Sequence, residues 1–183
     1  MDLFEAIGKR RSIRTYTKED VSEETVEKLI DAARWAPSAG NIQPWEFIII
    51  RNGETKRKLS AAALGQTSIE EAPVVVVVCA NQKRSARGYG QRGSTLYCLQ
   101  DTATATQNLL LAAYALGLGT CWIGAFKEEE ARQVLNLPMD VRPVAIIPVG
   151  HSAENPMAPS RRPLTEIIHY ENFKVKIHEI EYH

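Results

Sequence analysis

The segment Pro73–Ala80, with the sequence PVVVVVCA, restricts the possible folds of this chain more than any other. It contains five consecutive valines and no charged residue. An uncharged, β-branched run of this kind is typical of a strand that is covered on both faces. The run is far too short to cross a lipid bilayer. The sequence therefore predicts a fully buried strand, and the 44% apolar composition of the 183 residues is enough for one complete core.

Apolar periodicity and capping residues indicate the other elements. Ser22 is a candidate N-cap followed by two glutamates, which the helix dipole favours, and this helix should end before Pro37. The longest helix is expected over 96–116. The basic, glycine-rich segment 81–93 is interpreted as a mobile surface loop or lid. Further helices are expected at 3–7, 53–59 and 127–136, with one turn at 164–169, and further strands at 46–51, 120–123, 143–149 and 173–182.

Composition excludes several classes of partner. Lys plus Arg equals Asp plus Glu at 22 each, so no net charge attracts nucleic acid or an anionic membrane. Cys79, Cys98 and Cys121 lie in apolar surroundings without a CxxC pair, which favours buried, reduced thiols. The start, MDLFEAIGKRRS, has its charges after a short apolar patch, the reverse of a signal peptide. We expect a single cytoplasmic domain over residues 1–183.

A stiff polar turn lies within RWAPSAGNIQPWEF, residues 34–47. Ser38 and Asn41 stand between two prolines, which restrict the backbone and reduce the entropy lost when a ligand binds. Trp35 and Trp45 flank the turn, and we expect both to be buried with a partner for the indole N–H. Two interpretations remain open: a loop that binds a planar, hydrogen-bonding ligand, or a plain helix end followed by a strand.

Two arginine-serine clusters lie at opposite ends of the chain. The first holds three arginines and a serine, and the second follows Pro159. Arginine binds phosphate through two parallel hydrogen bonds and a serine hydroxyl adds a donor, so each cluster is a candidate phosphate site. The alternative is a solvated basic surface. In a chain without net charge, both clusters could converge on one dianionic group. The residues are Arg10, Arg11, Ser12 and Arg14 in the first cluster, and Ser160, Arg161 and Arg162 in the second.

Other catalytic motifs are missing from the sequence. The glycine-rich segment Gly117–Gly124 lacks GxGxxG spacing and follows an expected helix instead of a strand, so a Rossmann dinucleotide site is rejected. The sequence contains no GxxxxGK[ST], HExxH or GxSxG, and its four histidines lack metal-ligand spacing. Neither metal catalysis nor nucleophilic hydrolysis is expected. What remains is a site for a phosphate-bearing planar cofactor that carries its own reactivity.

Six motifs and their order along the chain resemble the nitroreductase family of FMN-dependent oxidoreductases. The resemblance extends from about Phe4 to Ile168. It implies an α+β fold, with a mixed central sheet packed between helices. It also implies an intertwined homodimer with FMN at the subunit interface. The alternating residues of the tail 170–183 separately indicate an edge strand, which could pair with the sheet of the partner subunit. The motifs are RRSIRTY, APSAGNIQPWEF, PVVVVV, LYCLQDTATATQNLLLAAYALGLGTCWIG, PVAIIPVGH and SRRPL.

The resemblance also implies roles for individual residues. Arg10 and Ser12 would hold the FMN phosphate with Arg161 or Arg162, with Arg11 in the same basic cluster, and Arg14 would lie near N1 and O2 of the flavin ring. Pro37, Ser38 and Asn41 would come from the other subunit. Gln66 would bind the pyrimidine edge, and the backbone N–H of Gly124 would face N5. Ile123 stands where many members carry Glu, and Ser68 where close relatives often carry an aromatic residue.

The function implied is hydride transfer from NADH or NADPH, through flavin N5, to a nitroaromatic, quinone or related acceptor in a ping-pong cycle. No side chain is then an indispensable catalytic acid or base, because the flavin and solvent supply the protons. Two alternatives remain open. One is a specialised branch that destroys flavin or removes halogen reductively, and the other is an FMN-binding protein for storage or sensing.

Overall fold

The computed structural model describes residues 2–173 and contains a four-stranded antiparallel sheet in the order β1-β2-β4-β3. Strand β2 pairs with β1 on one side and with β4 on the other, so that Val77 lies between Ile48 and Ile146. The chain has the expected α+β fold. The sheet is less mixed than expected, because the one parallel pairing in the described part is an isolated bridge between Ser12 and Thr120. The strands are β1 (Trp45–Ile50), β2 (Val74–Asn81), β3 (Gly119–Thr120) and β4 (Val141–Gly150).

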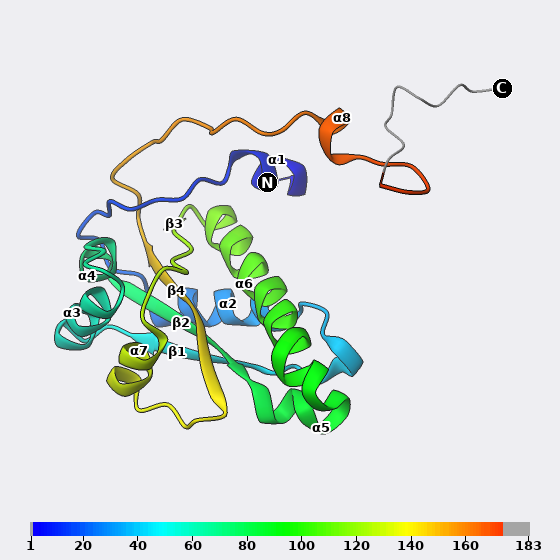
Figure 1. Ribbon diagram of the computed structural model, residues 1–183. Coiled ribbons are helices and arrows are strands. Elements are labelled where there is room, and N and C mark those ends of the chain that lie inside the picture. Colours follow the sequence, from blue (N-terminus) through cyan, green and yellow to red (C-terminus); the bar gives the residue numbers. More distant parts are fainter. Residues whose placement is uncertain (1, 174–183) are drawn as a thin grey trace.

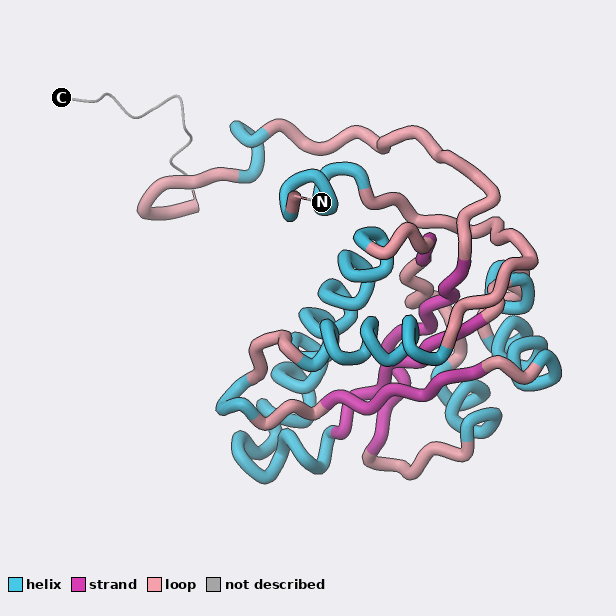
Figure 2. The backbone as a smooth tube through the Cα atoms, turned by 180° about the vertical axis from the view of Figure 1, so that it is seen from behind, coloured by secondary structure: helices cyan, strands magenta, loops and turns pink. Residues whose placement is uncertain are grey.

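Helices cover both faces of this sheet (Figures 1 and 2). On one face, alternate valines of β2 pack with α2 (Glu23–Arg34) and α6 (Cys98–Ala115). On the other face, the remaining valines pack with α3 (Gly53–Ala62), α4 (Ser68–Glu71) and α7 (Glu128–Leu135). Every valine of β2 is fully buried. The prediction of a strand covered on both sides is confirmed.

Capping explains where the helices start. The Ser22 hydroxyl accepts a hydrogen bond from the amide of Thr25, as its expected role at the start of α2 requires. Asn81 does the same for α5 (Gln82–Arg92), where its side chain accepts from the amide of Arg84 at 2.9 Å. The interpretation of 81–93 as a mobile loop was therefore wrong. The segment is a helix with a kink at Tyr89 and Gly90, and a π-helical turn, η2 (Gly93–Tyr97), joins it to α6.

Both ends of the described chain lie at the same end of α6 (Figure 1). Helix α1 (Leu3–Lys9) contacts α6, and an irregular segment leads from β4 to the short helix α8 (Leu164–Ile167). The two helices expose apolar side chains: Phe4 is 79% exposed and Leu164 is 65% exposed. The expected tail strand lies, from residue 174 onward, outside the described residues.

One smaller expectation is also met. Cys79, Cys98 and Cys121 are buried and free. In the part of the chain that the structure describes, no helix combines the length and the apolar character that crossing a membrane requires.

Candidate functional site

The two basic clusters meet in one cavity of about 350 Å³. All four residues of the first cluster line this cavity, whereas of the second cluster Arg161 does and Ser160 and Arg162 are not among the lining residues. That the clusters converge on one dianionic group stays a prediction. The loop after α1 forms one wall, and the irregular segment between β4 and α8 forms the other. The lining residues are Arg10, Arg11, Ser12, Arg14, Pro156, Met157, Pro159 and Arg161.

The N-terminal wall is fixed by pairing with the sheet edge. The amide of Ile13 donates to the carbonyl of Thr120 at 2.9 Å, beside the parallel bridge of Ser12 with Thr120. Gly119 permits this approach, because a Cβ there would lie 2.9 Å from the Ile13 side chain. Ile13 is buried, so its neighbours Ser12 and Arg14 are held at the cavity while Ile13 packs inward.

The second wall is bound directly to the first. The amide of Ala153 donates to Thr15 at 3.0 Å, and the amide of Thr17 donates to His151 at 2.9 Å. The Glu154 carboxylate accepts the amides of Arg14 and of Thr15, the latter at 3.0 Å. Glu154 was not singled out from the sequence, because its partners are backbone amides that a motif cannot reveal.

The electrostatics of the cavity favour an anion. Burial lowers the pKa of Arg10, and the positive charges of Arg11 and Arg161 lower it further, while Cys121 acts in the opposite sense. Close like charges of this kind cost energy unless a negative group joins them. Groups of His, Cys, Asp and Glu that could hold a metal ion are absent from the described residues.

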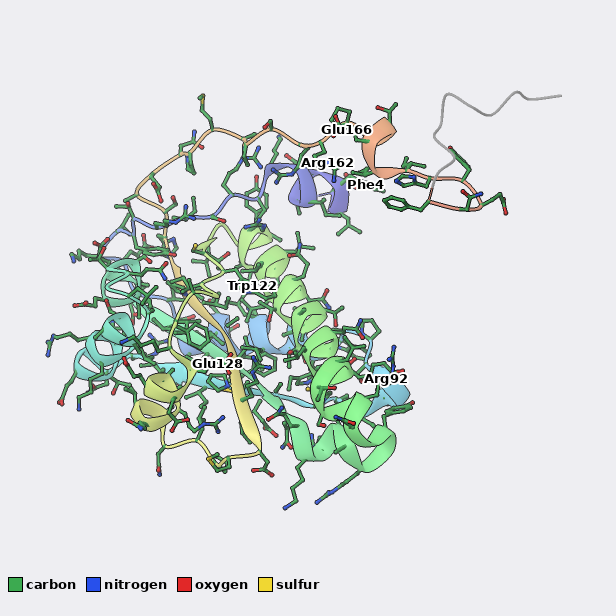
Figure 3. All side chains as sticks on the ribbon, in the orientation of Figure 1. Phe4, Arg92, Trp122, Glu128, Arg162 and Glu166 are labelled. Carbon is green, nitrogen blue, oxygen red and sulfur yellow. The ribbon has the colours of Figure 1, made fainter. Side chains whose placement is uncertain are left out.

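The structure distinguishes among the arginines. Arg11 donates to the carbonyls of Gly8 at 2.7 Å and Arg10 at 2.9 Å, so part of its guanidinium caps the end of α1. Arg162 pairs with Glu166 at 3.2 Å (Figure 3), and it is not among the residues that line the cavity. Arg161 lines the cavity, and the partners of its guanidinium among the described residues are the carbonyls of its near neighbours Pro159 and Ser160. Arg10, Arg14 and Arg161 are therefore the arginines best placed for an anion.

Gln66 and Gly124 lie close together, as expected for residues of one site. The side-chain amide of Gln66 donates to the carbonyl of Ala125 at 3.2 Å. Ile123 exchanges two backbone hydrogen bonds of 3.0 Å with Ile146, and its side chain is buried in the core. This pairing fixes the chain, and Gly124 follows it as an exposed residue. Ser68 is buried in α4.

The loop Pro37–Asn41 lies elsewhere in the same chain. The hydroxyl of Thr104 donates to the carbonyl of Pro37, and Asp101 accepts the amide of Ala39 at 3.1 Å. The basic cluster lies near the other end of α6, where Arg11 and Tyr114 line a common cavity. The helical rise between Thr104 and Tyr114 is about 15 Å. One chain therefore does not bring the loop to its own arginine cavity.

One expectation about this loop was wrong. Trp45 is buried at 7% exposure, but Trp35 is 75% exposed. Trp35 is the C-cap residue of α2, and the guanidinium of Arg34 lies over its ring at 5.6 Å. Its position beyond the last helical turn carries it away from the sheet. The sequence also gave no reason to choose Asp101 or Tyr89, whose contacts with the loop depend on the arrangement of α5 and α6.

Comparison with known proteins identifies relatives of the whole fold. The sequence model of the nitroreductase family matches residues 7–82 and 64–151. A relative from Methanothermobacter thermautotrophicus, whose name refers to NADH dehydrogenase and NAD(P)H nitroreductase, is 38% identical over 161 residues, covering 85% of this chain and 80% of that protein. The Bacillus subtilis protein named FMN reductase (NAD(P)H) is 31% identical over 185 residues, covering 94% of this chain and 74% of its own.

A solved structure shows the same arrangement. The NADPH:FMN oxidoreductase from Vibrio harveyi, determined in complex with NAD+, superposes with a TM-score of 0.87 at 26% sequence identity. The similarity covers 94% of this chain and 78% of that protein. With the family match extending over most of the sequence, this chain belongs to the nitroreductase family.

Proposed function

We propose that this chain is an FMN-dependent oxidoreductase that transfers hydride from NADH or NADPH to nitroaromatic, quinone or related acceptors by a ping-pong mechanism. Membership of the nitroreductase family and the names of its relatives support the enzyme class and the pairing of FMN with NAD(P)H. The single observation that carries the proposal is the cavity in which Arg10, Ser12, Arg14 and Arg161 converge.

The donors of this cavity fit a phosphate dianion. Guanidinium groups bind phosphate oxygens in pairs, and the Ser12 hydroxyl adds a further donor. The charge of Arg161, which lowers the pKa of Arg10, would be offset by the phosphate of FMN. The cluster would therefore hold the cofactor by its phosphate and orient the ring toward the exposed backbone of Gly124.

When bound, FMN supplies the redox chemistry, accepting hydride from the nicotinamide and passing it to the acceptor. The chain's own residues bind and polarise. Arg14 would place positive charge near N1 and O2, Gln66 would donate to the pyrimidine edge, and the amide of Gly124 would donate toward N5. None of these groups has to accept or release a proton during turnover. The contribution of the protein would be proximity, polarisation and exclusion of water.

We propose that the complete site forms between two copies of the chain. Pro37, Ser38 and Asn41 lie near the opposite end of α6 from the arginine cavity, so a second subunit would supply them. The exposed apolar residues of α1 and α8, including Phe4 and Leu164, would be covered in such a dimer.

The tail 170–183 would add a strand to the sheet of the partner subunit. Strand β1 offers an edge for this, because among the described strands it pairs only with β2. Ile49 on this edge is 40% exposed. The unpaired backbone N–H and C=O groups of an edge strand can form hydrogen bonds with a further strand, which an exposed apolar side chain also favours.

The test begins with the FMN-loaded protein under anaerobic conditions. NADH and NADPH are mixed with it separately, and flavin absorbance reports the rate of reduction. The reduced protein is then mixed with quinones, nitroaromatics and oxygen. Rapid reduction by either nucleotide and parallel lines in double-reciprocal plots are expected. Slow reduction by both would favour a storage or sensing protein, and failure to bind FMN would reject the proposal.

A further inference from the structure

The loop from Pro37 to Gln43 has an unusual backbone. Gly40, Asn41 and Gln43 have φ angles of +56°, +54° and +53°. The left-handed region is easy for glycine but costs about 1 kcal/mol for other residues, so it persists only where the surroundings hold it. Such a loop needs external contacts to keep its shape.

Several contacts supply that support. The Ser38 hydroxyl accepts the amide of Gln43 at 3.0 Å, and Arg84 of α5 donates to the Gln43 carbonyl at 3.2 Å. Tyr89 packs over Gly40 so closely that a Cβ there would lie 2.7 Å from the Tyr89 hydroxyl. Helix α5 thus restrains one side of the loop.

Helix α6 restrains the other side through a buried carboxylate. Asp101 is 6% exposed, and its Oδ1 accepts the amide of Ala39 at 3.1 Å. Its Oδ2 is buried and has no hydrogen-bond partner among the described residues. Burial raises the pKa of Asp101, and the Ala39 amide opposes that rise.

A buried carboxylate with one oxygen that lacks a hydrogen bond costs desolvation free energy, so stability alone does not explain its presence. Apolar residues of similar size commonly serve a helix-packing position at least as well as a buried charged group. The neighbouring buried residues of α6 include Ala105 and Leu109, which pack without such a cost. Within the described part of the chain, the hydrogen bond that the Asp101 side chain forms is the one from the Ala39 amide, and an apolar residue could not accept it.

We propose that Asp101 is a positioning residue that holds Ala39, and thereby Ser38 and Asn41, in the geometry with which this loop contacts FMN. The inference rests on the proposed function, in which the loop serves the flavin of the partner subunit. Asp101 itself does not touch the cofactor. It acts through the backbone of the loop, at a site where fixed geometry lowers the entropic cost of binding.

Substitutions of Asp101 separate positioning from stability. In Asp101→Asn, the amide oxygen can still accept the Ala39 N–H, whereas Asp101→Leu removes the acceptor. The FMN dissociation constant of Asp101→Leu should rise about tenfold, the usual scale for losing a hydrogen bond to a charged group. That of Asp101→Asn should stay within about threefold of wild type, even if both variants lose thermal stability. Thr106→Val, which alters a buried hydroxyl further along α6, is the matched control.

A readout without cofactor uses the apoprotein. Hydrogen exchange at the Ala39 amide should accelerate at least tenfold in Asp101→Leu, and remain close to wild type in Asp101→Asn and Thr106→Val. Equal exchange in all four proteins, or equal FMN affinity in Asp101→Leu and wild type, would overturn the proposal. A loss of affinity in Asp101→Asn as large as in Asp101→Leu would overturn it too.

The donor side gives a second route if Asp101→Leu does not fold. Ala39 begins the short 3₁₀ helix η1 (Ala39–Asn41), and Ser38 before it is extended at φ −142° and ψ 152°. Proline is accepted at a first helical position after an extended residue, so Ala39→Pro removes the N–H at modest backbone cost. It should weaken FMN binding about as much as Asp101→Leu. An unchanged affinity in Ala39→Pro would contradict the proposal.

Mixed dimers test whether the loop acts on the other subunit. A dimer of one Asp101→Leu subunit and one Arg10→Ala subunit would keep one undamaged site, built from the intact arginine cluster of one and the intact loop of the other. One FMN per dimer should bind with wild-type affinity. Weakened binding at both sites would overturn action in trans. If wild type itself fails to bind FMN, the proposed function fails, whereas FMN binding that ignores Asp101 refutes this inference alone.

Discussion

Arg10 and Arg161 lie near opposite ends of the described chain and line the same cavity, where burial lowers the pKa of Arg10 and the charge of Arg161 adds to that effect. The wall that carries Arg10 is anchored by the bridge of Ser12 with Thr120. The segment that leads to Arg161 is anchored at Glu154, whose carboxylate accepts the amide of Thr15. A cluster of cations assembled in this way favours the binding of an anion, which gives the first prediction.

Replacing Arg10 or Arg161 by alanine should weaken FMN binding. Each loses a charge-assisted contact worth about 1.5–3 kcal/mol, so the dissociation constant should rise roughly tenfold to a hundredfold. Arg162→Ala should change it less than about threefold, because Arg162 pairs with Glu166. Flavin fluorescence titration measures all three, with Arg57→Ala on α3 as a surface control. An effect of Arg162→Ala larger than that of Arg161→Ala would exchange their roles.

Glu154→Ala should loosen the contact between the two walls of the cavity. Its carboxylate accepts the amides of Arg14 and Thr15, and both lose their acceptor in the variant. Because the site is exposed, we expect a loss of only about 1 kcal/mol in the free energy of unfolding, measured with urea. Glu154→Gln, which keeps one acceptor oxygen, should lie between the variant and wild type. If Glu154→Ala unfolds at the wild-type urea concentration, this contact does not stabilise the wall.

Lys56 gives a prediction about pH. Its ammonium is buried and donates to the carbonyl of Ala72 at 2.7 Å. Burial, together with nearby Lys18, lowers the pKa of Lys56 below its usual value of 10.5. The unfolded chain therefore binds more protons than the folded chain between the lowered pKa and 10.5, and the stability contributed by this group rises with pH in that range.

The measurement compares urea unfolding of wild type and Lys56→Met from about pH 8 upward. The stability of wild type relative to the variant should increase as pH approaches the usual lysine pKa. Lys58→Met is the control, since Lys58 is an exposed residue of the same helix that pairs with Glu54. A constant difference between wild type and Lys56→Met across this range would contradict the prediction.

Gly119→Ala should disturb the N-terminal wall through packing. A Cβ at Gly119 would lie 2.9 Å from three carbons of Ile13, so Ile13 and its neighbour Ser12 must shift. Overpacking of this kind costs about 1–3 kcal/mol, and the displacement of Ser12 should also weaken FMN binding. Gly53→Ala is the matched control, because a Cβ there meets nothing within 4 Å. Equal stability of the two variants would show that Ile13 can shift without a loss in the free energy of unfolding.

The sequence was sufficient where local chemistry decides the structure. The valine run of β2 and the Ser22 cap of α2 are recognisable without tertiary information, and both are observed. The two arginine clusters were also recognisable, because their chemistry points to one kind of ligand. Which arginines face the cavity was not, since the pairing of Arg162 with Glu166 depends on the turn of α8.

The failures share a physical cause. Helix α5 was missed because its two glycines and many charges suggest a loop, while its start depends on one capping contact from Asn81. Asp101 was missed because nothing in the alternation of small residues around it reveals a buried acceptor for Ala39. Trp35 was expected in the interior because tryptophan is a large aromatic residue, but its position at the end of α2 leaves the side chain exposed. Each of these depends on where one element meets another.

Helix α6 separates the loop from the arginine cavity of the same chain, and this separation makes cofactor binding depend on protein concentration. If one chain binds the phosphate of each FMN and the loop of the other chain covers it, dilution that dissociates the dimer also releases the cofactor. The apparent affinity for FMN would then fall with protein concentration, and excess FMN would drive the chains back together by mass action. Supply of the vitamin-derived cofactor would in this way control how much assembled protein a cell contains.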